Sequence, residues 1–184
     1  MGKSTTAAMF LDLGVPVWDA DSAVHRLYGP NGAAVEPIRQ IYPAAVQKGT
    51  VQREILKEWI AKDPSAFGQI EQVVHPLVAK DRSVFIADSL ADIVVLDVPL
   101  LFETGANEQM DAVVVVSAPA AEQRRRVLDR GTMTTAQFKA ILAKQMPDAE
   151  KRKNADFIIE TNNLDDTAKQ VESVLRQIKR QRDA

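Results

Sequence analysis

Four short apolar runs, at residues 15–18, 93–96, 112–116 and 157–159, most constrain the fold that this chain can adopt. The runs are nearly continuous rather than alternating, which is typical of strands covered on both faces, and helical patterns separate most of them. This order predicts an α/β fold in which helices flank a parallel sheet. With 184 residues the chain is long enough for one substantial core, and we expect a single domain over residues 1–184.

Directly after Met1 the chain reads Gly2, Lys3 and Ser4, which match the closing half of a phosphate-binding loop. Apolar residues at helical spacing follow as far as Gly14, which predicts a helix whose positive N-terminal end faces phosphate oxygens. The opening glycine and the preceding strand are absent from the sequence, so we expect an incomplete phosphate loop. The alternative for these residues alone is an ordinary capped helix. An N-myristoylation signal is also matched, but no polybasic patch follows it as a second anchor.

The composition argues against several classes of function. The chain holds 23 Lys and Arg against 25 Asp and Glu, so a broad nucleic-acid surface is not expected. It contains no cysteine, which excludes disulfides, a thiolate nucleophile and cysteine zinc sites. Asp12 interrupts the apolar segment near the N-terminus, and no run reaches the length of a membrane span. We therefore expect a soluble cytoplasmic protein without a membrane anchor.

Two carboxylates, Asp19 and Asp21, directly follow the first predicted strand, at the edge where open α/β sheets bind ligands. Beside a phosphate loop, Asp21 is a candidate general base, because transfer of a phosphoryl group to an alcohol needs an acceptor for the hydroxyl proton. The alternative is that Asp21 caps a helix beginning at Ser22. Asp97 follows another buried strand and could hold Mg²⁺, or could pair with backbone N–H groups.

The segment 28–90 predicts several short helices and no strand, and we interpret it as a helical insertion that contributes to an acceptor site. Pro64, Pro76 and Pro119 each fit the first turn of a helix. His75 precedes Pro76, and we interpret it as a hydrogen-bonded histidine at a helix start. A metal-ligand role is not favoured, because the chain has only 2 histidines and no acidic neighbour at ligand spacing was identified.

An arginine-rich helix precedes Gly131, and Thr134 is a candidate N-cap of the helix that follows. Arg126 and Arg130 are four residues apart, hence on one helix face. One interpretation of these consecutive charged residues is that they form a solvent-exposed helix face. The helix, glycine, helix arrangement over 124–150 is also what a closing lid needs to neutralise a transferring phosphoryl group.

Taken in order, these motifs run through the whole chain. The motifs are residues 2–5, residues 13–17 leading into 19–21, residues 74–78 and residues 97–105. They continue with the predicted helix over residues 123–130, Gln145, and residues 155–156 before the last strand. This ordered set resembles the dephospho-CoA kinase family, whose members use ATP and Mg²⁺ to phosphorylate the ribose 3′-hydroxyl of dephospho-CoA in the last step of coenzyme A synthesis. The resemblance implies a P-loop NTPase-like fold, with the acceptor-binding insertion at 28–90 and the lid at 124–150.

The resemblance also implies roles for individual residues. Lys3 would bridge the β- and γ-phosphates, Ser4 would ligate Mg²⁺, and Gly2 with Thr5 would line the phosphate cradle. Asp21 would be the general base and would meet Lys3 at the tips of adjacent strands. Arg130, with Arg126, would stabilise the migrating phosphoryl group. The acceptor pocket would be shaped by His75, the insertion, and a floor over 99–103 that includes Pro99 and Leu100.

Two departures from the family pattern follow from the sequence. The missing N-terminal strand lies in the middle of the family's sheet, so its loss would leave unpaired backbone groups as well as a damaged phosphate site. After Asp156 the family tends to carry Asn and then Asn-Gly, whereas this chain reads Thr161, Asn162 and Asn163. The alternatives are a catalytically impaired nucleotide-binding relic and a small kinase of the nucleoside-monophosphate type.

Overall fold

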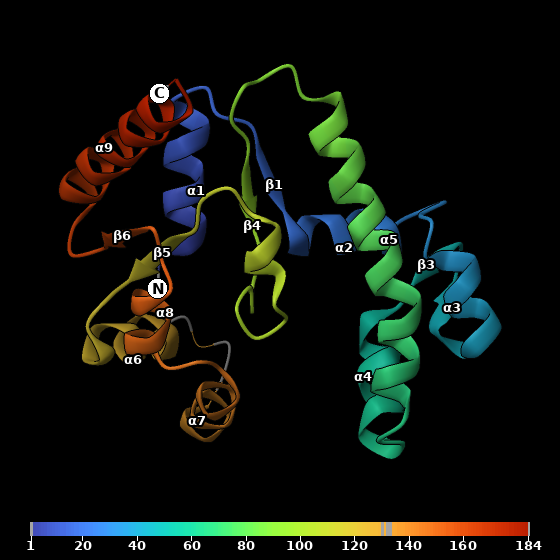
Figure 1. Ribbon diagram of the computed structural model, residues 1–184. Helices are drawn as coiled ribbons and strands as arrows, with labels where there is room; N and C mark the ends of the chain where they lie inside the picture. Colours follow the sequence, from blue (N-terminus) through green and yellow to red (C-terminus); the bar gives the residue numbers. More distant parts are fainter. Residues whose placement is uncertain (1, 130, 132–133, 184) are drawn as a thin grey trace. The chain divides into compact units, whose positions relative to one another are not determined.

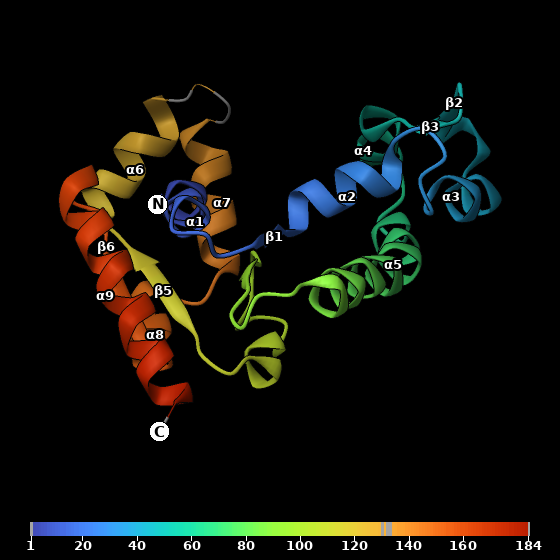
Figure 2. The same cartoon turned by 90° about the horizontal axis from the view of Figure 1, so that it is seen from above.

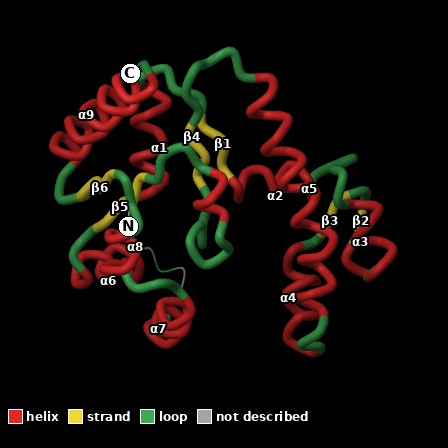
Figure 3. Tube along the Cα trace, in the orientation of Figure 1, coloured by secondary structure: helices red, strands yellow, loops and turns green. Residues whose placement is uncertain are grey.

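The computed structural model describes residues 2–129, 131 and 134–183. The chain folds into two compact units (Figures 1 and 3). The first unit combines Met1–Val17 with Asp97–Ala184, and the second unit is Trp18–Leu96. The division shows that the residues between the first predicted strand and Asp97 form a core of their own.

The first unit contains a pair of parallel strands together with several helices. Strands β5 (Val114–Ser117) and β6 (Phe157–Glu160) pair in parallel with Val114 opposite Phe157. Helices α1 (Lys3–Asp12) and α9 (Leu164–Arg182) pack together, and Figures 1 and 2 both show α9 alongside β6. The other elements are η2 (Ala106–Gln109), α6 (Ala120–Asp129), α7 (Thr135–Lys144) and α8 (Asp148–Lys153).

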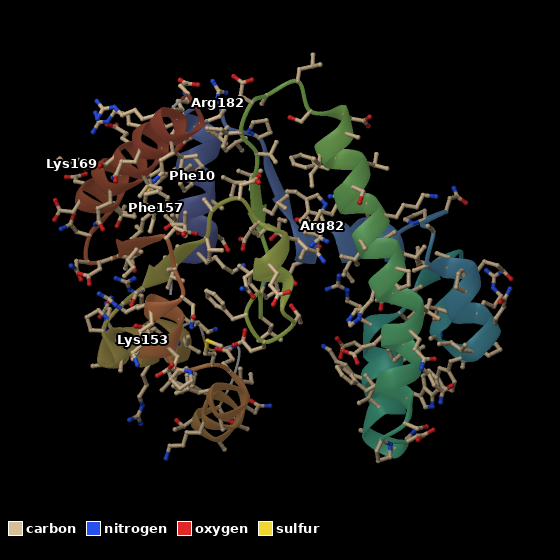
Figure 4. All side chains as sticks on the ribbon, viewed as in Figure 1. Phe10, Arg82, Lys153, Phe157, Lys169 and Arg182 are labelled. Carbon is tan, nitrogen blue, oxygen red and sulfur yellow. The ribbon has the colours of Figure 1, made fainter. Side chains whose placement is uncertain are left out.

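Burial on one face explains why α9 forms and where it lies. Its buried residues Thr167, Val171, Val174 and Leu175 recur at helical spacing. The Asn163 side chain begins the helix by accepting a hydrogen bond from the backbone N–H of Asp166 at 2.8 Å. On α1, Phe10 is only 4% exposed, and Figure 4 labels it between α1 and α9. The two helices therefore share one apolar core.

The second unit is mainly helical. Its elements are α2 (Ala20–Tyr28), α3 (Val35–Ile41), η1 (Pro43–Ala45), β2 (Val46–Gln47), β3 (Thr50–Val51), α4 (Arg53–Lys62) and α5 (Ala66–Asp88). The short strands β1 (Val17–Asp19) and β4 (Val95–Asp97) include its first and last residues, and Val17 and Asp97 are counted with the first unit. Strands β1 and β4 are neighbours in a two-stranded sheet. Leu27, Ile38, Leu56 and Ile70 belong to one buried cluster. This cluster draws on α2, α3, α4 and α5, so the segment has its own hydrophobic core.

The predicted α/β class is confirmed, and each of the four predicted strands lies within two residues of an observed one. The expectation of no strand in 28–90 is wrong, because β2 and β3 pair as an antiparallel hairpin. The turn between them places Lys48 and Gly49 at φ of +50° and +75°. Strands of two residues are too short to show an alternating pattern.

The expectation of several short helices is also wrong for the end of that segment, where α5 runs for 23 residues. Pro76 lies inside α5 rather than in a first turn. A proline there removes one backbone hydrogen bond, and the helix continues because buried Val74 before it and partly buried Leu77 after it both pack into the core.

Candidate functional site

The N-terminus of α1 is open to an anion. Gly2 occupies the N-cap position with φ of +93°, in the left-handed region that a glycine adopts without strain. No side chain of the described residues caps the helix, no acidic residue lies in its first turn, and Ser4 and Thr5 are exposed. Helix N-terminal N–H groups without such partners, together with the helix dipole, favour a bound phosphate.

Lys3 and Asp97 form an ion pair although 94 positions separate them. The Asp97 carboxylate is almost completely buried, at 3% side-chain exposure, whereas 39% of the Lys3 side chain is exposed. A buried carboxylate requires a partner, and the Lys3 ammonium is the partner that the structure provides. Two residues predicted to serve the nucleotide phosphates and the metal are thus brought together at the start of α1.

Arg126 is anchored to the end of β6 rather than free in solvent. Its guanidinium donates to the Thr161 hydroxyl at 3.0 Å, to the Thr161 carbonyl at 2.7 Å and to Glu122 at 2.6 Å. A Cβ atom added to Gly2 would lie 3.1 Å from the Thr161 methyl carbon. Thr161 therefore contacts both the arginine-rich helix and the start of α1, a role that its sequence position did not reveal.

Glu122 orients two arginines of α6. Hydrogen bonds from Arg125 and Arg126, together with their positive charges, lower the pKa of the Glu122 carboxyl to about 2. The spacing of three and four residues on one helix could have indicated this cluster from the sequence. The predicted helix, glycine, helix pattern is confirmed on the described residues, because Gly131 has φ of +65° and Thr134 begins α7 with a capping box. Arg130 lies outside the described residues.

The loop after β4 carries the predicted pocket floor. Pro99 and Leu100 are exposed, and Leu100 adopts φ of +59°, which is strained for a branched side chain. Glu103 instead points into the first unit, where it accepts from the backbone N–H of Met146 at 2.8 Å and pairs with Lys151 at 2.9 Å. Partial burial tends to raise the pKa of Glu103, but these donors hold it below its ordinary value. The loop is therefore tied to the segment that follows α7.

In the second unit, the two carboxylates where β1 meets α2 have different environments. Asp19 is the N-cap of α2 and accepts from the backbone N–H of Ser22 at 2.7 Å. The alternative in which Asp21 caps the helix is therefore wrong. Asp21 lies in the first turn of α2, is exposed, and has no hydrogen-bond or ion-pair partner within the described ranges. Its carboxylate is available to a substrate.

His75 is a surface residue in the middle of α5, with 68% of its side chain exposed. The expectation of a helix-start histidine is wrong, and so is the expectation of no acidic neighbour, since Glu71 lies one turn earlier at 3.6 Å. No group of three or more His, Cys, Asp or Glu side chains that could hold a metal occurs among the described residues.

Lys3 and Asp97 are thus brought together within the first unit, and Asp21 and His75 lie in the second. That Lys3 and Asp21 meet in one cavity stays a prediction. Over the described part of the chain, no helix is both long and apolar enough to span a membrane.

Comparison with known proteins identifies related chains over nearly the full length. A curated dephospho-CoA kinase of Cereibacter sphaeroides is 55% identical over 184 residues, covering 100% of this chain and 93% of that protein. A dephospho-CoA kinase of Ruegeria pomeroyi is 56% identical over 179 residues, covering 97% and 91%. These matches do not confirm the expectation of a missing central strand or of an impaired enzyme.

A dephospho-CoA kinase structure from Campylobacter jejuni superposes with a TM-score of 0.71 at 27% identity, covering 98% of this chain and 93% of that one. A crystal structure of a Thermus thermophilus protein gives a TM-score of 0.82 at 32% identity, with coverage of 96% and 91%. The sequence pattern of one family, described as dephospho-CoA kinase, matches residues 1–166. The chain therefore belongs to the dephospho-CoA kinase family.

Proposed function

We propose that this chain transfers the γ-phosphoryl group of ATP to the ribose 3′-hydroxyl of dephospho-CoA and so produces coenzyme A. The observation that carries the proposal is the uncapped N-terminus of α1, where Lys3 lies beside the buried Asp97 carboxylate. An oriented lysine and free backbone N–H groups are what binding of a nucleotide polyphosphate needs. Membership of the family supplies the acceptor.

The donor phosphates are bound, in this proposal, by the N–H groups of Gly2 to Thr5 and by Lys3. Lys3 neutralises charge on the β- and γ-phosphate oxygens, and Arg130 with Arg126 stabilises the migrating group from the lid over 124–150. Charge neutralisation is the main catalytic requirement of phosphoryl transfer, because the transition state spreads negative charge over the equatorial oxygens.

Magnesium fits the residues at the start of α1. Mg²⁺ is commonly held by one or two protein oxygens with water and substrate phosphates completing its shell, so a large cluster of protein ligands is not needed. The exposed Ser4 hydroxyl and the Asp97 carboxylate are suitable oxygen donors. When bound, the ion neutralises phosphate charge. Its use by this chain is part of the proposal.

Most residues assigned to the acceptor belong to the second unit. Asp21 accepts the proton of the 3′-hydroxyl as that oxygen attacks phosphorus, a role supported by its exposed carboxylate, which has no competing partner among the described residues. His75 and the insertion over 28–90 contact dephospho-CoA, and Pro99 and Leu100 lie against it from the loop after β4. The protein's expected place in the cytoplasm also stays a prediction.

The test is ADP release by the purified chain with ATP, Mg²⁺ and dephospho-CoA, compared with a separate reaction in which AMP replaces dephospho-CoA. Asp21→Asn should lower kcat about 100-fold with a small change in the KM for ATP, because it removes the proton acceptor and leaves the phosphate site intact. Glu172→Gln, at an exposed carboxylate of α9 outside the insertion and the lid, is the matched control. Phosphorylation of AMP alone would favour a nucleoside-monophosphate kinase, and nucleotide binding without transfer would favour a relic.

A further inference from the structure

One carboxylate oxygen of α5 accepts hydrogen bonds from a residue just before α2 and from a residue in its last turn. The indole N–H of Trp18 donates to Oδ1 of Asp81 at 2.7 Å, and the Arg26 guanidinium donates to the same oxygen at 2.6 Å. Trp18 is the strand residue just before the Asp19 cap, and Arg26 lies in the last turn of α2. Figure 4 labels Arg82, the next residue along α5, close to α2.

The burial of Trp18 makes its contact with Asp81 a strong constraint. Trp18 is 3% exposed, and a buried indole N–H without an acceptor would cost more than a hydrogen bond contributes. Burial tends to raise the pKa of Asp81, but hydrogen bonds from Arg26 and Trp18 and the charge of Arg26 keep it below its ordinary value. Asp81 is therefore ionised at neutral pH and accepts from both donors.

Asp21 lies between the two anchored positions. Its own side chain has no partner among the described residues, so its direction depends on the backbone of α2. That backbone is set by the Asp19 cap, by buried Ala23 and Leu27, and by the two bonds to Asp81. Small displacements of a reacting group are costly in rate.

We propose that Asp81 is a positioning residue that holds α2, and with it the Asp21 carboxylate, in the orientation required for proton acceptance. The inference rests on the proposed function, in which Asp21 is the base. Asp81 touches neither substrate in this account and acts through Trp18 and Arg26.

The experiment is a double-mutant cycle on kcat with Asp81→Ala and Asp21→Asn. Asp81→Ala should lower kcat about 10-fold and leave the KM for ATP within about twofold, because the donor site belongs to the other unit. In the Asp21→Asn background the same substitution should change kcat by less than about twofold, since there is no longer a base to position. Glu172→Gln, at an exposed carboxylate of α9 outside the insertion, controls for loss of a negative charge.

A second variant separates positioning from folding. Asp81→Asn keeps an oxygen that can accept from Trp18 but loses the charge that holds Arg26, so its kcat should fall between parent and Asp81→Ala. In a Trp59→Phe background Trp18 is the only tryptophan, and its emission then reports the loss of the hydrogen bond in Asp81→Ala.

Two results would overturn the inference. A full 10-fold loss from Asp81→Ala in the Asp21→Asn background, or a parental kcat in the folded single variant, would show that Asp81 does not act through Asp21. If Asp21→Asn itself kept parental kcat, the proposed base would be wrong, and the role of Asp81 would fail with it for a distinguishable reason. Should Asp81→Ala not fold, Trp18→Phe and Arg26→Gln remove the donors separately and replace it in the cycle.

Discussion

Replacement of Lys3 by methionine tests whether one ion pair serves both stability and phosphate binding. The substitution keeps the length of the side chain and removes its charge, so the Asp97 carboxylate, 3% exposed, remains buried without its partner. Breaking a fully buried pair costs about 3 to 5 kcal/mol. Lys3 is 39% exposed, so water already screens the pair and we expect about 2 kcal/mol.

Thermal unfolding followed by circular dichroism measures this loss. A cost of that size should lower Tm by about 4 to 8 °C in a chain of 184 residues. Lys3→Met should also depress kcat/KM strongly, because charge neutralisation at the phosphates is lost. The double variant Lys3→Met with Asp97→Asn should recover most of the Tm, since the buried charge is gone, but none of the activity.

Two outcomes would refute this reasoning. An unchanged Tm in Lys3→Met would mean that Asp97 finds another partner or takes up a proton at no net cost. Recovery of activity in the double variant would mean that Lys3 acts only by compensating Asp97, and that the phosphates are bound elsewhere.

Three further predictions concern stability and are measured by urea denaturation. Ile159→Ala should lower the free energy of unfolding by about 3 kcal/mol, because the Ile159 side chain is 0% exposed. Ile158→Ala on the same strand should lower it by less than about 1 kcal/mol, because Ile158 is 37% exposed. Equal losses in the two variants would contradict this packing. Gly68→Ala should raise stability by about 0.5 to 1 kcal/mol, because a Cβ added there meets no atom within 4 Å. Gly32→Ala should lower stability, since its Cβ would collide with the backbone oxygen of Leu27. The carboxyl of Glu122 has a pKa lowered from 4.5 to about 2, so its contribution is present above pH 4.5 and lost as pH falls toward 2. The stability difference between parent and Glu122→Gln should shrink over that interval, and a difference independent of pH would contradict the assignment.

Much of the secondary structure was predictable because its signals are local. Gly14 has φ of +80° directly after α1, Gly131 has φ of +65° after α6, and the Thr134 capping box begins α7. Each depends on steric limits or hydrogen bonds within one turn of the chain. The β2–β3 hairpin was not predicted, because each strand has only two residues and only the Lys48-Gly49 turn carried a signal.

The pairing of charges was not predictable in this way. Lys3 with Asp97 joins positions 94 apart, and Trp18 with Asp81 joins positions 63 apart. A sequence pattern identifies a carboxylate after a strand, as it did for Asp97, but not the group that lies against it. The environment of Asp21 likewise became clear only when Asp19 proved to be the cap.

The sequence by itself determined the kinds of elements, their order, and the residues suited to bind phosphate, because periodicity, caps and short motifs act over a few neighbouring positions. Tertiary structure decided which carboxylates are engaged and which are free. Lys3 pairs with Asp97, and Trp18 and Arg26 donate to Asp81. Asp21 has no partner among the described residues. The physical reason is that desolvation of a charge and its compensation depend on groups brought together from distant parts of the chain, which no local pattern specifies.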